Sequence, residues 1–498
     1  MIRDIFKKFV TYGIGNLLQT GLNLILLPLY LRCFSPAEYG VISVLSVVIS
    51  LLTLLSSAGV VNGLTRLFYE NEGAVKSRLV CSSYVWYFFM AVVGGTIIYT
   101  QGHVLSRLLF KTDLQIYPIR MIGLIFFFTM VRTIPFYLLR LEKRALQFVG
   151  FSLLGFFLDF SFKLYFIVYL KRGIPGYFES TAIATVITFF GMFPIVRQHL
   201  NVFPDKVFLI KLLRLGVPYI FSGLAVWSLD VSDRLLLNHF SSESAVGVYS
   251  LAYTFANIFV IFLTTPVSLF MDPFFFGFAA EHPLPQTKEL LQKMMIYFFL
   301  AGGILYLLIG LAGPEILRIL VKPGGNAVGY LKAGELIPVL TWAPFLYFLT
   351  IPMTLSGLLI KKTEINSYVC FITAALNIVL NLFLIPRLGA WGAAISTFIA
   401  FFMLIIILDK WVNVLFDVGY PWLRVLKGLG YMGIAFALSW PLNFHSPWLS
   451  LMAKVIVGIG SFLALSWSGR GFLSPSEKIN LMHLAEGIFS FIFRKRYV

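Results

Sequence analysis

Residues 389–408 read GAWGAAISTFIAFFMLIIIL, twenty consecutive residues without a charge. A helix rises about 1.5 Å per residue, so this length crosses the roughly 30 Å of hydrocarbon in a lipid bilayer. Similar stretches recur from one end of the chain to the other, and no segment between them reaches 20 residues. Membrane-spanning strands would instead need about ten residues of alternating polarity. The sequence therefore predicts an all-α polytopic membrane protein.

We expect about 14 transmembrane helices on the basis of length and composition. Their connecting segments are too short to hold a soluble catalytic or nucleotide-binding domain, so any site is expected to lie between helices. The expected spans are residues 9–33, 40–63, 80–100, 119–139, 148–170, 177–196, 212–238, 246–275, 290–313, 333–358, 365–385, 389–408, 424–442 and 448–468.

The composition agrees with a membrane protein. Hydrophobic residues make up 59% of the chain and charged residues 12%, with a mean hydropathy of +0.88. Soluble proteins average roughly 25% charged residues. The net charge of +17 could suggest a nucleic-acid partner, but the basic residues lie in short loops between spans. We therefore expect membrane lipids, with anionic headgroups, as neighbours and no nucleic acid.

The distribution of Lys and Arg predicts the orientation in the membrane, because basic residues are retained on the cytoplasmic side during insertion. With the N-terminus inside, the inner loops and both tails carry about 25 basic residues and the outer loops about ten. Both termini are therefore expected to be cytoplasmic.

The two halves of the chain show a faint internal repeat. Tyr39–Ser43 is similar to Val246–Ser250, and Gly173–Gly176 is similar to Gly389–Gly392. An even number of helices per repeat relates the halves by an axis along the membrane normal. We expect two pseudo-symmetric six-helix lobes around a central cavity. The expected domains are residues 1–200 and 201–412 for the two lobes, 413–470 for two additional transmembrane helices and 471–498 for a cytoplasmic amphipathic interfacial helix.

The interfacial helix has a start signal of its own. Ser474-Pro475-Ser476-Glu477 has the pattern of a capping box with Pro at the first helical position. Apolar residues follow on one face, as expected for a helix lying on a membrane surface.

Ionisable residues within the spans each need an explanation, because a charge at the bilayer centre costs roughly 2.5 kcal/mol or more. Arg132 lies near the middle of residues 119–139 and has no acid at helical spacing. Its planar guanidinium suits a phosphate. The alternatives are an anionic ligand in a cavity or an ion pair with another helix.

Two acid–base pairs lie at the spacing that favours intrahelical pairing. They are Asp159 with Lys163 and Asp230 with Arg234, the latter beside Asp233. Such pairs can simply neutralise each other for insertion. They can also line a cavity, where the bases contact a polyanion and the acids exchange a cation.

Other polar residues in the spans are open to two interpretations. Asn16, Gln19 and Asn23 form a polar stripe within residues 9–33. The stripe can join helices through hydrogen bonds or contact sugar hydroxyls. Lys454 lies near the start of residues 448–468, and we expect its ammonium group to extend outward to the surface, with no assigned role.

Enzymatic motifs are missing from the sequence. Gly324-Gly325 has no following Gly-Lys-Ser/Thr, and the six His and three Cys residues are scattered. We expect no catalytic residues, no metal site and no cofactor.

Five segments, in order along the chain, resemble the polysaccharide exporters of the multidrug/oligosaccharidyl-lipid/polysaccharide (MOP) flippase superfamily, including the Wzx-type O-antigen flippases. The resemblance covers about residues 1–412. The segments are Leu29–Gly40 (LYLRCFSPAEYG), Asp233–Leu235 (DRL), Val246–Ala252 (VGVYSLA), Asn377–Leu382 (NIVLNL) and Ile385–Ala394 (IPRLGAWGAA).

The resemblance implies a non-enzymatic flippase in the cytoplasmic (inner) membrane of a bacterium. Its two lobes would open alternately and pass a lipid-linked oligosaccharide to the outer leaflet, in exchange for protons or sodium. A polysaccharide polymerase and glycosyltransferases would be further partners. The bases expected at the pyrophosphate are Arg132, Lys163 and Arg234, the cation-coupling acids are Asp159, Asp230 and Asp233, and the sugar contacts are Asn16, Gln19 and Asn23.

Three alternatives remain open at this stage. Fourteen spans, rather than the twelve frequent among O-antigen flippases, also fit lipid II or teichuronic-acid-type relatives. A cation-coupled multidrug antiporter of the same superfamily would favour an acidic cavity. A membrane-embedded glycosyltransferase or polymerase would need a large outer loop or an acidic catalytic cluster, and the sequence contains neither.

Overall fold

The structure is a computed structural model that describes residues 26–321, 326–360, 362–469 and 471–483. Within these ranges every regular element is a helix, which confirms the predicted all-α class. Twelve helices are long and apolar enough to cross a membrane. They correspond to twelve of the fourteen predicted spans.

The other two predicted spans have different outcomes. Most of residues 9–33 lies outside the described residues. Residues 424–442 correspond to α18 (Trp422–Ser439), which is not among the twelve. Arg424 and Lys427 in its first turns lower the mean hydropathy of this helix.

The chain divides into two compact units. Among the described residues, the first unit comprises 26–252, 320–321, 326–333 and 367–400, and the second comprises 253–319, 334–360, 362–366, 401–469 and 471–483. The lobe boundaries expected at residues 200 and 412 stay a prediction.

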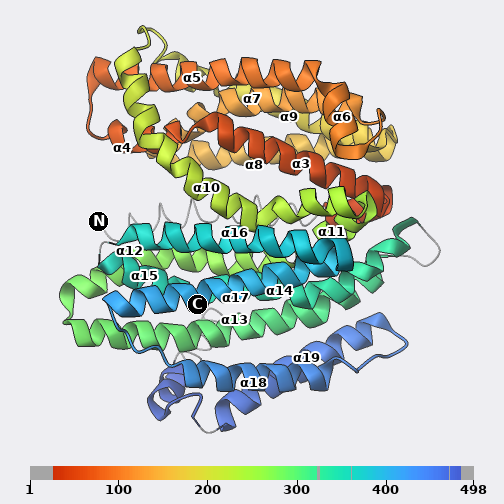
Figure 1. Cartoon of the computed structure of the whole chain (residues 1–498), viewed down its shortest axis with the longest axis vertical. Coiled ribbons are helices and arrows are strands. Elements are labelled where there is room, and N and C mark those ends of the chain that lie inside the picture. The colour runs from red at the N-terminus through yellow and green to blue at the C-terminus, as the bar shows by residue number, and fades with distance from the viewer. Residues whose placement is uncertain (1–25, 322–325, 361, 470, 484–498) are drawn as a thin grey trace, which may run out of the picture. The chain divides into compact units, whose positions relative to one another are not determined.

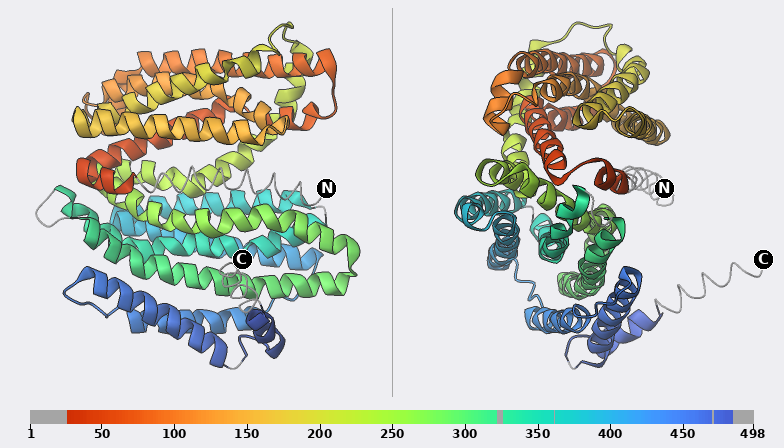
Figure 2. Two further views of the ribbon diagram at one scale, coloured as in Figure 1. Left: turned by 180° about the vertical axis from the view of Figure 1, so that it is seen from behind. Right: turned by 90° about the vertical axis from the view of Figure 1, so that its right-hand side faces the viewer.

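The first unit is built mainly from a bundle in which α5 contacts α7, α7 contacts α9, and α9 contacts α8 (Figure 1). The right-hand view of Figure 2 looks nearly along the axes of these helices. The long helix α10 crosses α3 and α4. The elements are α2 (Leu27–Cys33), α3 (Pro36–Ser57), α4 (Val60–Phe68), α5 (Gly73–Thr100), α6 (Gly102–Phe110), α7 (Ile116–Leu141), α8 (Ala145–Lys163), the π-helix η1 (Leu164–Tyr169), α9 (Gly173–Arg197), α10 (Lys206–Phe240), most of α11 (Glu243–Phe259) and η3 (Asn326–Lys332), with parts of α16 (Thr363–Leu388) and α17 (Ala390–Leu415).

The segments of the first internal repeat pack against each other. A Cβ atom built on Gly40 would lie 1.8 Å from a carbonyl oxygen of α11, and one built on Gly247 would lie 1.8 Å from a carbonyl oxygen of α3. The Ser43 and Ser250 hydroxyls are 2.6 Å apart. Glycine is required at both positions because the two backbones touch. Residues at equivalent positions of the two repeat segments therefore contact each other.

The second unit contains the remaining spans and a C-terminal hairpin of α18 and α19, which contact each other. The predicted capping box is confirmed, since the Ser474 N–H donates to Glu477 and the Glu477 N–H to the Ser474 hydroxyl. Helix follows at residues 475–483, and residues 484–498 lie outside the described ranges. The elements are η2 (Val260–Thr264), α12 (Thr265–Glu281), α13 (Leu284–Leu320), α14 (Ala333–Leu349), α15 (Ile351–Leu359), α18 and α19 (Pro447–Ser468).

Candidate functional site

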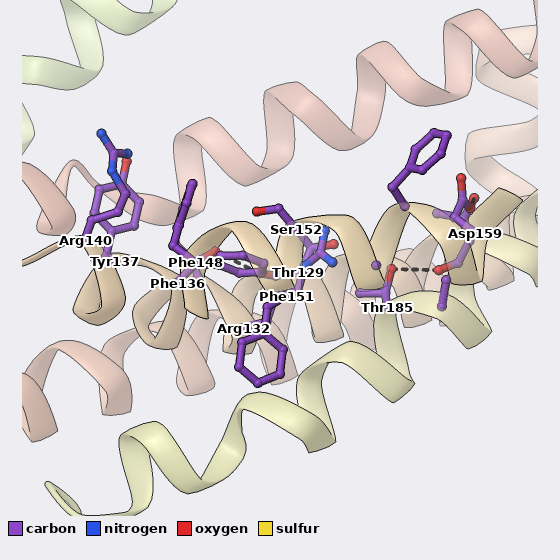
Figure 3. A pocket seen from close by; sticks show the side chains of 15 residues that line it. Thr129, Arg132, Phe136, Tyr137, Arg140, Phe148, Phe151, Ser152, Asp159 and Thr185 are labelled. Carbon is purple, nitrogen blue, oxygen red and sulfur yellow. Dashed lines mark hydrogen bonds between the residues drawn. The ribbon is translucent and has the colours of Figure 1, made fainter. Parts of the chain in front are cut away.

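A cavity of about 410 Å³ lies among α7, α8 and α9 in the first unit (Figure 3). Its volume is within the range of small-ligand sites. Charged, hydroxyl-bearing and aromatic side chains line it together. These are Arg132, Arg140 and Asp159, then Thr129, Thr133, Ser152, Thr181 and Thr185, and finally Phe136, Tyr137, Phe148, Phe151 and Phe156.

The charges follow one another along the cavity. Figure 3 shows Arg140 at one end, Asp159 at the other and Arg132 between them. Both arginines lie on α7, eight residues apart, which corresponds to about 12 Å along the helix axis. The cavity therefore offers an elongated ligand two cationic contacts at different depths.

The Arg132 side chain makes no hydrogen bond or ion pair within the part of the chain that the structure describes. Its guanidinium carbon lies 5.8 Å from the centre of the Phe136 ring on the same helix. The side chain is half-buried. A guanidinium in this position has unused donors that face the cavity, and it can bind an anion there.

Asp159 and Lys163 form the predicted intrahelical pair, with 2.7 Å between Nζ and Oδ2. The other carboxylate oxygen accepts a hydrogen bond of 2.9 Å from Thr181 on α9. Lys163 is 5% exposed, and its Nζ lies 4.2 Å from the centre of the Tyr177 ring. This ammonium group is therefore held by a carboxylate and an aromatic face.

The helix geometry changes directly after this pair. α8 ends at Lys163 and continues as the π-helix η1. π-helical turns inside α-helices are rare and often lie at functional sites. The irregular segment begins at the residue after Lys163.

A second polar cluster joins α10, α11 and α17. Asp233 is fully buried and accepts hydrogen bonds from the Tyr249 hydroxyl and from Thr397 Oγ1, the latter at 3.4 Å. The Arg234 backbone N–H donates to its other oxygen at 3.1 Å. These donors satisfy a carboxylate that would otherwise be costly to bury.

Arg234 belongs to the same cluster. Its Nε donates to the Ser250 hydroxyl at 3.3 Å, and its Nη1 donates to the backbone carbonyl of Asp230 at 3.0 Å. The Asp230 residue itself is exposed on α10. The predicted acid–base triplet thus lies together on one helix and connects to the repeat contact through Ser250.

Two buried asparagines were missed by the sequence analysis as site residues. Asn377 and Asn381 are both 0% exposed, and Asn381 Nδ2 donates to Asn377 Oδ1 at 3.0 Å. Asn377 Nδ2 and Asn381 Oδ1 have no partner among the described residues. Gly389 lies between α16 and α17, eight residues after Asn381 and eight residues before Thr397. Asn381 in α16 and Thr397 in α17 are therefore at similar distances along their helices from this connection. The sequence signal that could have identified them is their four-residue spacing within an apolar segment, which places both side-chain amides on one helix face.

A buried ionic cluster in the second unit was also missed. Glu315 is fully buried, with Lys454 Nζ 2.6 Å and Arg318 Nη1 3.1 Å from its Oε1. Asn443 Oδ1 accepts from Lys454 at 2.9 Å. The expectation that Lys454 extends outward was wrong, because this side chain is 3% exposed. The predicted span ended at residue 313, whereas α13 continues to Leu320 and includes Glu315.

The predicted site residues thus fall into three sets. One set lies at the cavity, namely Arg132, Asp159 and, bonded to Asp159, Lys163. The α10 set is Asp230, Asp233 and Arg234. The third set, Asn16, Gln19 and Asn23, lies outside the described residues. The cavity hydroxyls of Thr181 and Thr185 were not predicted, although their four-residue spacing places them on one helix face.

Comparison with protein families gives one match over a large part of the chain. Residues 5–277, more than half of the 498 residues, match the family described as "Polysaccharide biosynthesis protein". The match includes α7 to α11 and therefore the cavity and the Asp233 cluster apart from Thr397 on α17.

Curated relatives are more distant. "Probable multidrug resistance protein NorM" of Caulobacter vibrioides is 27% identical over 212 residues, which cover 40% of this chain and 42% of that protein. "Probable flippase AglR" of Haloferax volcanii is 26% identical over 242 residues, which cover 47% of this chain and 48% of that protein. The chain spans less than half the length of either relative.

Solved structures match over most of the chain. The lipid II flippase MurJ in an inward closed conformation has a TM-score of 0.71 and 14% identity, covering 93% of this chain and 96% of that chain. An inward-facing multidrug resistance MATE family transporter of the MOP superfamily has a TM-score of 0.65 and 14% identity, covering 82% and 95%. At these identities the likeness concerns the fold.

Proposed function

We propose that this chain, which belongs to the family described as "Polysaccharide biosynthesis protein", is a non-enzymatic transporter of the MOP superfamily that flips a polyprenyl-diphosphate-linked oligosaccharide. The substrate would move from the cytoplasmic to the outer leaflet of a bacterial inner membrane. The observation that carries the proposal is Arg132, a guanidinium without a hydrogen bond or ion pair among the described residues, on the wall of a cavity inside a membrane-spanning bundle. A diphosphate supplies the anion that this group lacks.

The remaining wall suits the sugar part of such a substrate. Thr133 donates its hydroxyl proton to the Thr129 carbonyl at 2.8 Å, and Thr185 donates to the Thr181 carbonyl at 2.7 Å. Their oxygens still have lone pairs that can accept hydrogen bonds from sugar hydroxyls. Aromatic rings such as Phe136 and Phe148, whose centres are 5.8 Å apart, offer apolar faces to sugar rings. The lipid tail would remain in the bilayer.

Lys163 is the proposed second contact to the diphosphate. It is bonded to Asp159, so an arriving phosphate would compete with that carboxylate for the same ammonium group. Release of Asp159 would leave it able to take up a cation. Arg234, on α10, is the third proposed base, and Asn16, Gln19 and Asn23 remain proposed sugar contacts.

Cation coupling is the less direct part of the proposal. Asp159, Asp230 and Asp233 are the proposed acids, with a proton or sodium as the ion. Asp233 is the best supported because hydroxyl oxygens of Tyr249 and Thr397 lie against its carboxylate. Hard cations prefer such oxygen ligands. Alternating movement of two six-helix lobes, residues 1–200 and 201–412, would expose the cavity to each side in turn, with both termini cytoplasmic.

A vesicle assay tests the proposal. The purified protein is reconstituted with a fluorescent undecaprenyl-diphosphate oligosaccharide, and outward movement is measured by accessibility to an external glycosidase. We expect transfer that depends on the protein and responds to an imposed proton or sodium gradient. Lack of response to both gradients would remove the three acids from the coupling role.

Multidrug antiport is the competing function, because one curated relative carries that description. The cavity lining contains two arginines and one aspartate, a charge balance that disfavours organic cations. Gradient-driven export of ethidium from the same vesicles, without sugar-lipid transfer, would replace the proposal.

A further inference from the structure

A second hollow of about 320 Å³ lies between α5 and α7 in the first unit. We call it the α5–α7 groove and define it by Val92, Thr96, Tyr99, Arg120, Leu124 and Phe127. At its floor Gly95 and Gly123 bring the helices together, since a Cβ atom on Gly123 would lie 2.9 Å from the Gly95 carbonyl oxygen. Because glycine has no side chain, space remains beside the point where α5 and α7 make contact.

The α5–α7 groove faces away from the cavity of Arg132. Leu124 and Phe127 each precede a cavity residue of α7, Thr133 and Phe136, by nine residues. Nine residues correspond to two and a half turns, so the groove and the cavity lie on opposite faces of the helix. Val92 is 42% and Leu124 40% exposed, as expected for apolar side chains that face hydrocarbon. The groove is therefore a surface toward lipid.

Arg120 is the charged residue of this surface. Its Nε is buried and has no hydrogen-bond partner within the described residues, and no acidic side chain lines the groove. The guanidinium carbon lies 5.5 Å from the centre of the Tyr99 ring, near the ends of α5 and α7. Aromatic residues at helix ends typically mark the membrane interface. The Tyr99 ring thus holds a cation near the helix ends, and this cation has no counter-ion among the described residues.

We propose that the α5–α7 groove binds an anionic phospholipid, with its phosphate at Arg120 and an acyl chain along Val92, Leu124 and Phe127. The headgroup and the acyl chain of the lipid each match a feature of the groove. The unpartnered guanidinium selects an anion, and the apolar, outward-facing lining selects an alkyl chain over a soluble anion. Lipid binding here is independent of what the cavity transports.

Native mass spectrometry tests this site. The purified full-length protein is released from detergent after addition of phosphatidylglycerol or phosphatidylethanolamine, and the lipid-bound fraction is measured. We expect Arg120→Ala to weaken phosphatidylglycerol binding about fivefold, the factor that corresponds to roughly 1 kcal/mol for one basic residue at a membrane surface. Binding of phosphatidylethanolamine should change less.

The matched control is Arg107→Ala, an exposed arginine on α6 that is paired with Asp113 at 2.8 Å. It should bind phosphatidylglycerol like the wild type. A second variant, Val92→Trp, fills the groove at an exposed position without removing a charge, and it should weaken binding of both lipids. Unchanged binding in Arg120→Ala, or an equal loss in Arg107→Ala, would overturn the proposal. Thermal unfolding of each variant verifies that it is folded.

Discussion

Arg132 in the first unit and Lys454 in the second are basic side chains in membrane-spanning helices, but their surroundings differ. Lys454 is enclosed by Glu315 and Asn443 at hydrogen-bond distances and is 3% exposed. Arg132 lines a cavity and has no ion pair among the described residues. The Lys454 ammonium group is satisfied within the protein, whereas we propose that an anionic substrate supplies the partner of Arg132.

The energetic consequence follows from the cost of a charge in a low-dielectric environment. Removing one partner from a buried ion pair leaves an uncompensated charge and costs about 3–5 kcal/mol. Removing Arg132, which has no ion pair among the described residues, leaves no oppositely charged side chain without its ion-pair partner. Mutations in the two regions should therefore affect different properties, stability in the second unit and transport in the first.

The largest expected effect is on stability. Glu315→Ala removes the carboxylate that Lys454 and Arg318 share, so we expect the free energy of unfolding to fall by about 3–5 kcal/mol. Thermal unfolding of the purified protein in detergent measures it. Glu289→Ala is the matched control, because Glu289 lies on the same helix in an exposed pair with Lys293. Equal melting temperatures for the two variants would contradict a stabilising role for the Glu315 cluster.

The next effect concerns transport. Arg132→Ala should reduce sugar-lipid transfer at least about 30-fold, the factor that corresponds to roughly 2 kcal/mol for a lost contact to a desolvated charge. The melting temperature should stay unchanged, because the side chain makes no bond to a described residue. Arg132→Lys should retain part of the activity since it keeps the charge but not the planar fork.

The control for this comparison is Arg66→Ala, an exposed arginine on α4 of the same unit. It should transport like the wild type. Full activity of Arg132→Ala in the vesicle assay would remove Arg132 from the substrate site.

How far these two regions could be predicted depends on how far apart their partners lie in the sequence. Hydropathy predicted most of the spans, and the four-residue spacing of Asp159 and Lys163 predicted their pair, because both signals are local. Glu315 and Lys454 are 139 residues apart, so their pairing requires the packing of α13 against α19. No local pattern carries that information.

The cavity shows the same limit. Arg132 was identified because a charge inside an apolar run is visible in the sequence. Its neighbours Thr181 and Phe148 come from other helices, and polar or aromatic residues at such positions are common in membrane proteins. Only the folded bundle distinguishes those that face the cavity.

A double substitution separates the electrostatic from the packing contribution in the second unit. Glu315→Leu combined with Lys454→Met replaces the pair by apolar side chains of similar size. We expect it to be more stable than Glu315→Ala by at least about 2 kcal/mol, because no buried charge is left without a partner. Thermal unfolding of the wild type, of Glu315→Leu, of Lys454→Met and of the double variant gives the coupling energy of the pair. A double variant no more stable than Glu315→Ala would show that the pair contributes more than mutual neutralisation.

The smallest expected effect comes from an exposed pair, which sharpens the contrast with the buried cluster. Arg107, which donates to Asp113 at 2.8 Å, holds the pKa of the Asp113 carboxyl below its ordinary value of 3.8. A carboxyl whose pKa is lower in the folded state stabilises the fold above its unfolded pKa, and this contribution is lost as the pH falls through the folded value. At neutral pH Asp113→Asn should lower the melting temperature only slightly, since solvent screens exposed pairs. The difference between variant and wild type should shrink as the pH falls below about 3.8 and vanish only below the lower pKa that Asp113 has in the folded protein. A melting-temperature difference that persists at acidic pH would mean that Asp113 acts through hydrogen bonds of its neutral form.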